Sequence, residues 1–110
     1  MKYYEKKDFA RSIALFEDIL PIIRGTKEAE SANFYYAYAH FYQDLFILSA
    51  HYFETFIEIY SRSNLAIEAN YMFGYSFLSC VFGGPKKTWK ISLALFLSLI
   101  SLLQLHNFLL

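Results

Sequence analysis

The chain has 110 residues, of which 56% are apolar and 21% aromatic, and its ten basic residues balance its ten acidic residues. This length allows at most one domain. The high apolar content argues against a disordered segment, and the lack of a basic stripe argues against a nucleic-acid-binding protein. Four glycines and two prolines are too few for an all-β chain with many tight turns.

The pattern of apolar residues predicts amphipathic helices at about residues 9–22, 27–42, 45–60 and 64–80. Asp8 is the expected N-cap of the first helix. Pro21 lacks an N–H and should kink or end that helix, and Gly25 can take the left-handed conformation that often follows a helix. The expected caps of the three following helices are Thr26, Asp44 and Ser63.

After these helices we expect a loop at residues 83–88 and a last, apolar helix at residues 89–110. Helices of this length that are joined by short loops pack as antiparallel neighbours. The predicted fold class is therefore all-α, with residues 1–82 forming antiparallel helix pairs and residues 89–110 forming a partial third pair or an aberrant tail.

The sequence also repeats itself at an offset of 37 residues, as "SIALFEDIL" and the later "SAHYFETFI" show. Each copy has a large aromatic residue, a small residue three positions later and a phenylalanine four positions after that. These repeat-packing positions are Phe9, Ser12 and Phe16, then Phe46, Ser49 and Phe53, then Trp89, Ser92 and Phe96 at a further offset of 43, with Ala37 and Gly74 as small residues of the preceding helices. A small residue allows two helices to cross closely, and the rings beside it fill the groove. The alternative is a non-repetitive helical bundle with similar core requirements.

A helix pair of about 34 residues that stacks on the next pair is typical of tetratricopeptide repeats. The small and aromatic positions of this chain resemble that consensus, so we expect a tetratricopeptide-repeat-like superhelix. The proline that is usual near the end of the repeat is absent from the second copy, where Ser61 stands.

Residues 3–80 resemble a narrower family, the outer membrane protein assembly lipoprotein BamD in the form found in Bacteroidota. The segments that carry this resemblance are "YYEKKD" at 3–8, "PIIRGT" at 21–26, "YYAY" at 35–38 and "EANYMFGYSF" at 68–77. The resemblance implies a scaffold without catalysis or cofactor on the periplasmic face of the outer membrane. Its implied partners are a BamA-like barrel subunit of the β-barrel assembly (BAM) complex and unfolded barrel substrates.

The sequence departs from this family at both ends. The family continues upstream of Met1, where its signal peptide and lipid-bearing cysteine stand, so the resemblance implies an N-terminal lipid anchor and predicts that residues 1–110 are a fragment or have a misplaced start. The family has charged amphipathic helices after about Phe96, whereas residues 91–110 carry no Asp, Glu, Lys or Arg. This segment can be the second helix of a truncated third repeat, a membrane span of sufficient length, or the product of a frameshift. The alternative function is a generic helical-repeat adaptor with a membrane-anchoring helix at 91–110.

The candidate contacts for a peptide or partner are Tyr35, Tyr38 and Tyr42, which share one helical face at three- and four-residue steps. Tyrosine suits this role because it combines apolar area with a hydrogen-bonding tip. The alternative is that these rings belong to the core.

No catalytic, metal-binding or cofactor-binding residues are predicted. His40, His51 and His106 form no pair at ligand spacing, and we expect His40 to pack in the core. A lone Cys80 on an apolar helix indicates a small core residue. Three acidic residues, Asp44, Glu54 and Glu58, are expected to be a cap and solvated side chains, and "GGPKK" lacks the spacing of a phosphate-binding loop.

Overall fold

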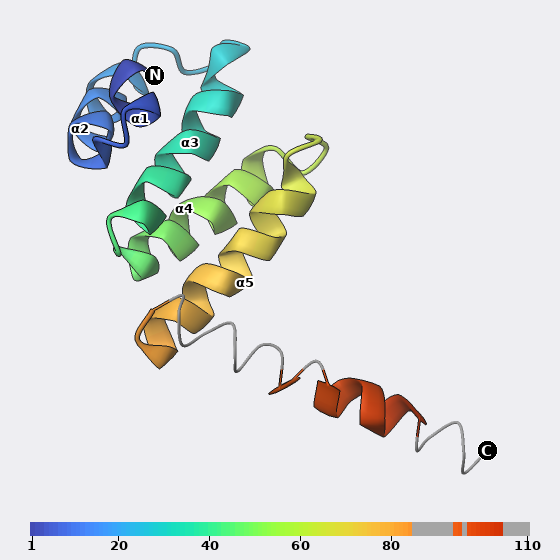
Figure 1. The fold of residues 1–110 in the computed structure, drawn as a ribbon. Helices are drawn as coiled ribbons and strands as arrows, with labels where there is room; N and C mark the ends of the chain where they lie inside the picture. Colours follow the sequence, from blue (N-terminus) through green and yellow to red (C-terminus); the bar gives the residue numbers. More distant parts are fainter. Residues whose placement is uncertain (85–93, 96, 105–110) are drawn as a thin grey trace.

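The computed structural model describes residues 1–84, 94–95 and 97–104. It contains α1 (Lys2–Glu5), α2 (Phe9–Ile19), α3 (Glu28–Tyr42), α4 (Phe46–Ile59) and α5 (Ala66–Phe82). Residues 97–104 are also helical, and none of the residues described forms a strand. The predicted all-α class is therefore confirmed. From α1 to α5, each helix packs against the next one in the chain, so that these helices form a layered, repeat-like series (Figure 1).

The start and end of α2 follow from its sequence. The Asp8 carboxylate accepts a hydrogen bond from the Arg11 backbone N–H at 3.4 Å, as predicted for the N-cap. The helix ends at Ile19, two residues before Pro21 and earlier than the predicted residue 22. Gly25 has a φ of 82° and so takes the predicted left-handed conformation. The short helix α1 was not predicted.

The three other predicted caps are corrected by the structure. Thr26 donates its hydroxyl to the Ile23 carbonyl at 2.6 Å instead of capping α3. Asp44 has a φ of 60° and belongs to the turn that ends α3, so Leu45 is the residue at the start of α4. Ser63 accepts the Leu65 N–H at 3.1 Å, but α5 starts after Leu65 and has no side-chain cap.

The prediction that Cys80 lies in the core is also wrong, because its side chain is exposed near the end of α5. The buried side of this part of α5 is formed by Ser76 and Ser79. His40, in contrast, is buried as predicted, and its Nδ1 lies 2.8 Å from the Tyr36 carbonyl oxygen.

The turn that ends α1 is the same as the turn that ends α3. Lys7 and Asp44 both have a φ of 60° and lie 37 residues apart. The N–H that follows each of them bonds to a carbonyl five residues back, Asp8 to Tyr3 at 2.7 Å and Leu45 to His40 at 3.0 Å. This is the six-to-one bond of a Schellman helix end. The repeat seen in the sequence is thus also present in the backbone.

The end of α5 has this arrangement as well. Gly83 has a φ of 83°, and the Gly84 N–H bonds to the Ser79 carbonyl at 2.8 Å. The helices α1, α3 and α5 therefore end alike, and each is the first helix of a pair in the expected order.

The core lies where α3, α4 and α5 meet. Its buried members are Phe34, Ala37, Phe41, Phe53, Phe56, Ala69 and Met72. At the crossing of α3 and α4, the Ser49 hydroxyl donates to the Ala37 carbonyl at 3.0 Å and lies 3.1 Å from the Ser76 hydroxyl. The repeat-packing positions of the first two copies are all buried or half-buried, whereas Trp89, Ser92 and Phe96 lie outside the described residues.

Gly74 occupies the position that matches Ala37, but its surroundings differ. A Cβ added to Gly74 meets no atom within 4 Å, whereas Ala37 is fully buried. Replacing Gly74 with alanine should therefore stabilise α5 by about 0.5–1 kcal/mol, because glycine is a poor helix former. Urea denaturation should show a higher midpoint with an unchanged slope, and a lower midpoint would mean that the added methyl group is crowded by a neighbouring atom.

Within the residues that the structure describes, no helix is both long enough and apolar enough to cross a membrane. Half of residues 91–110 lie outside that description, so the membrane-anchor interpretation of this segment stays a prediction.

Candidate partner-binding site

The three predicted contact tyrosines all lie on α3, but their environments differ. Tyr35 and Tyr38 are half-buried, while Tyr42 at the end of the helix is 50% exposed. The rings of Tyr38 and Tyr42 are stacked, with their centroids 5.9 Å apart. Tyr38 and Tyr42 therefore lie on the same side of α3, as their helical spacing predicted.

Tyr38 belongs largely to the core. Its ring packs edge-on against Phe34 and Phe53, with a centroid distance of 5.1 Å in each case. Its hydroxyl donates a hydrogen bond to the Glu68 carboxylate on α5. Burial, followed by this hydrogen bond, raises the pKa of Tyr38 above its ordinary value. This tyrosine links α3 to α5 and offers little area to a partner.

Tyr35 and Tyr42 instead border an aromatic hollow of about 580 Å³ between α1, α2 and α3. Tyr4 of α1 packs against Tyr35 at 5.1 Å, and Phe9 of α2 stacks on Tyr42 at 4.8 Å. Tyr4 and Phe9 are themselves edge-on at 5.4 Å, so the four aromatic side chains form a continuous row from Tyr35 to Tyr42. We call these four residues and their hollow the tyrosine hollow; its other lining residues are Met1, Glu5 and Lys7.

The contribution of Tyr4 was missed by the sequence reasoning, which expected no helix before Asp8. The repeat offset contained this signal, because Tyr4 lies 37 residues before Phe41, and each is an aromatic residue next to the last residue of its helix. Phe9 was predicted only as a packing residue, and the structure gives it a place in the hollow as well.

A second hollow, of about 420 Å³, lies between α2 and α3 and shares Tyr35 with the tyrosine hollow. Its apolar lining comes mainly from Phe16, Ile19 and Ile23 of the α2 region and from Ala32 of α3. Tyr35 therefore lines two apolar hollows, so an extended ligand that contacts this ring can reach both.

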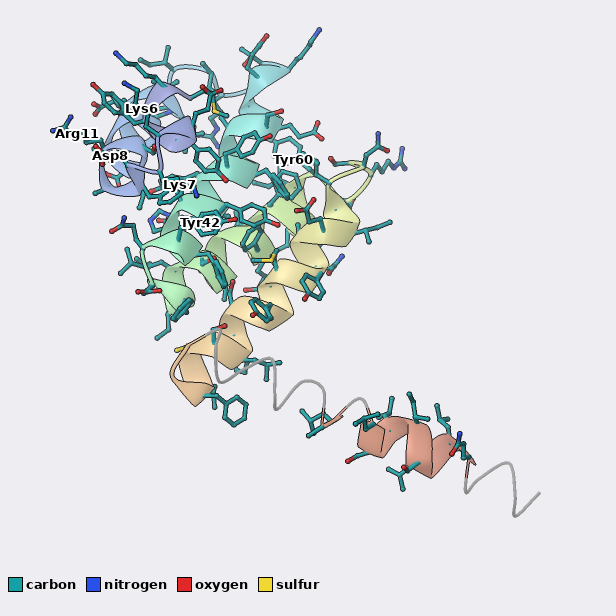
Figure 2. All side chains as sticks on the ribbon, in the orientation of Figure 1. Lys6, Lys7, Asp8, Arg11, Tyr42 and Tyr60 are labelled. Carbon is teal, nitrogen blue, oxygen red and sulfur yellow. The ribbon has the colours of Figure 1, made fainter. Side chains whose placement is uncertain are left out.

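The electrostatics of the tyrosine hollow favour a neutral ligand. Its two charged lining residues, Glu5 and Lys7, have opposite signs, and Figure 2 shows Lys7 at the turn beside Tyr42. Burial, with smaller contributions from Tyr42 and Tyr35, raises the pKa of Tyr4 above its ordinary value. The hydroxyl of Tyr4 therefore stays protonated at neutral pH and acts as a hydrogen-bonding group without charge.

The described part of the chain holds no group of three or more His, Cys, Asp or Glu side chains that could bind a metal ion. The ring of His40 packs against Tyr36 and Tyr52 at 4.5 and 4.8 Å. His51 is exposed on α4, and His106 lies outside the described residues. Glu54 and Glu58 are exposed, as expected for solvated side chains, and Asp44, which was expected to be a cap, is exposed in the turn after α3.

Comparisons with known proteins do not assign this chain to a family. No family model, no curated protein and no solved structure matches it significantly.

Proposed function

We propose that this chain is a non-catalytic helical scaffold whose tyrosine hollow binds an extended segment of a partner protein. The observation that carries the proposal is the pairing of Tyr35 and Tyr42, partly exposed, with the packed rings of Tyr4 and Phe9. A hollow of about 580 Å³ falls in the size range of ligand sites in proteins. Tyrosines that are held rigid lose little entropy on binding, which is why they are enriched at protein interfaces.

The order of the helices supports a repeat scaffold of the tetratricopeptide class. Proteins of this class stack helix pairs so that each pair contacts its neighbours, and they use the resulting curved surface for binding. Equivalent helix ends at Lys7 and Asp44, together with the Ser49 crossing, are consistent with that architecture.

We further propose that the scaffold serves the BAM complex, at the periplasmic face of the outer membrane. The support is that two of the segments that resemble BamD border the hollow: residues 3–8 contribute Tyr4, Glu5 and Lys7, and residues 35–38 contribute Tyr35. The proposed partners are a BamA-like barrel subunit and unfolded barrel substrates, whose strands alternate apolar and polar residues.

Binding of labelled peptides tests this function. We expect fluorescein-labelled peptides of about ten residues, taken in steps along an outer membrane barrel protein, to raise the fluorescence anisotropy on titration with the chain. The Tyr35→Ala and Tyr42→Ala double variant should bind about tenfold more weakly or worse, as for the loss of interface hot spots. Phe77→Ala is the matched control, because Phe77 is an exposed aromatic residue on α5 outside the hollow.

Three outcomes separate the alternatives. Equal weakening in the control variant would place the binding site elsewhere. Loss of helical circular dichroism in the double variant would show that Tyr35 and Tyr42 are core residues. Equal binding of peptides with shuffled sequence would favour a generic adaptor over a scaffold for barrel substrates.

A further inference from the structure

The outer side of α5 carries an apolar stripe that no other described helix covers. Ile67 and Tyr71 are 82% and 67% exposed, and Gly74 has open space above it. These residues, with Leu78, recur at steps of four, three and four and so lie on one face of the helix. The opposite face of α5 is buried against α4 through Ala69, Met72 and Ser76, among others.

The matching stripe of α3 is covered by α4. The residues that precede the α5 stripe by 37 positions are Glu30, Phe34, Ala37 and Phe41. Phe34 packs on Phe53 and Phe56 at 6.0 and 5.5 Å, and Phe41 packs on Phe46 at 5.3 Å. A second helix thus covers this stripe in the second pair, whereas none of the helices that the structure describes occupies the equivalent position beside α5.

Residues 97–104 form a helix with the properties that this position requires. Its sequence, "LSLISLLQ", contains no charged residue, and Leu97, Leu99, Leu102 and Leu103 are all exposed. Figure 1 shows this helix, in red, away from α5 and beyond its end. Two apolar surfaces in one chain are therefore both in contact with water, which favours their association.

The repeat register specifies how the two surfaces match. An offset of 43 residues relates 97–104 to 54–61, so Leu99 corresponds to Phe56. Phe56 packs on Phe34, and Phe34 corresponds to Tyr71. Leu99 should therefore meet Tyr71 if the third pair packs as the second pair does.

We propose that residues 97–104 fold back within the same chain and dock on the α5 stripe as the second helix of a third pair. The turn at Gly83 and Gly84 has the bond that reverses the chain after α1 and α3. Even at the helical rise of about 1.5 Å per residue, the twelve residues between Gly84 and Leu97 can span about 18 Å, which equals the distance along α5 from its end at Gly83 back to Tyr71. This docking does not depend on the proposed function.

Cysteine cross-linking tests the docking. In the full chain with Cys80→Ser, cysteines introduced as Tyr71→Cys and Leu99→Cys should form an intramolecular disulfide under mild oxidation. The control chain keeps the native, exposed Cys80 and carries Leu99→Cys alone. Cys80 lies nine residues beyond Tyr71, about 14 Å along the helix, so the disulfide yield in the control should be several-fold lower.

Equal disulfide yields in the two chains would overturn the proposal, because they would show that residues 97–104 have no fixed position on α5. Disulfide-linked dimers from the Tyr71 and Leu99 pair would also overturn it, since the segment would then occupy a second copy. A third outcome would also overturn the proposal: the chain floats with phosphatidylcholine vesicles and forms no intramolecular disulfide. That result would show that residues 97–104 bind lipid instead of α5.

Small-angle X-ray scattering gives an independent measurement on the unmodified chain. The arrangement in Figure 1 has a Cα radius of gyration of 16.9 Å, whereas a compact chain of this length has about 13 Å. Docking should bring the measured value close to the compact one in the monomer. A monomer value near or above that of the arrangement in Figure 1 would overturn the proposal.

Discussion

Replacing Phe53 with alanine should lower the free energy of unfolding by about 3–5 kcal/mol. Phe53 is 0% exposed and packs edge-on against Phe34 and Tyr38 of α3, at centroid distances of 6.0 and 5.1 Å. Truncation removes these contacts and leaves a cavity at the centre of the core, where α3, α4 and α5 meet. Because domains of this size are stable by about 5–15 kcal/mol, the loss should be visible as a large drop in the urea midpoint of the circular dichroism signal.

Phe77→Ala provides the matched control for this prediction. Phe77 is 59% exposed on α5, and truncation of an exposed side chain changes stability by about 0.5 kcal/mol or less. A cost below about 1 kcal/mol for Phe53→Ala, or equal costs for the two variants, would contradict the packing order described above. It would instead indicate a loosely packed bundle without a fixed crossing.

Much of this fold could be predicted from the sequence, because apolar residues at helical spacing and a small residue at each crossing are local signals. Ser49 illustrates this: its size and its position 37 residues after Ser12 were sufficient to predict the crossing with α3. The caps were harder, because a cap depends on the backbone angles of its residue. Asp44 has the side chain of a good cap, but its left-handed conformation commits it to the preceding helix end.

The candidate site was predicted only in part, for a related reason. Helical spacing gave the shared face of Tyr35, Tyr38 and Tyr42, but it cannot show which neighbouring helix covers which ring. Tyr38 faces Phe53 and Glu68 and is largely a core residue, whereas Tyr42 lies over Phe9 at the edge. Contacts between segments distant in sequence, such as Tyr4 with Tyr35, require the three-dimensional arrangement.

Alkaline solution should destabilise the protein steeply, starting near pH 10. Burial raises the pKa of Tyr36 above its ordinary value of about 10, and it does the same for Tyr4 and Tyr38. The unfolded chain loses these phenolic protons at lower pH than the folded chain does, so the stability present below pH ~10 is lost as the pH rises further. A fully buried tyrosine contributes up to about 1.4 kcal/mol per pH unit. Tyr4 and Tyr38 should contribute less, because both are partly exposed and therefore screened by solvent.

Tyr36→Phe tests the origin of this alkaline transition. Tyr36 is 7% exposed, and its hydroxyl donates to the Glu17 carboxylate at 3.2 Å. The phenylalanine variant loses that hydrogen bond, at a cost of about 1 kcal/mol near neutral pH, but it has no proton to lose at this position. Its free energy of unfolding, measured by urea titration at about pH 8 and at several values above pH ~10, should therefore fall less steeply than that of the parent. Equal slopes in the two proteins would mean that Tyr36 is accessible to solvent in the folded state, which the packing of α3 between α2 and α4 does not allow.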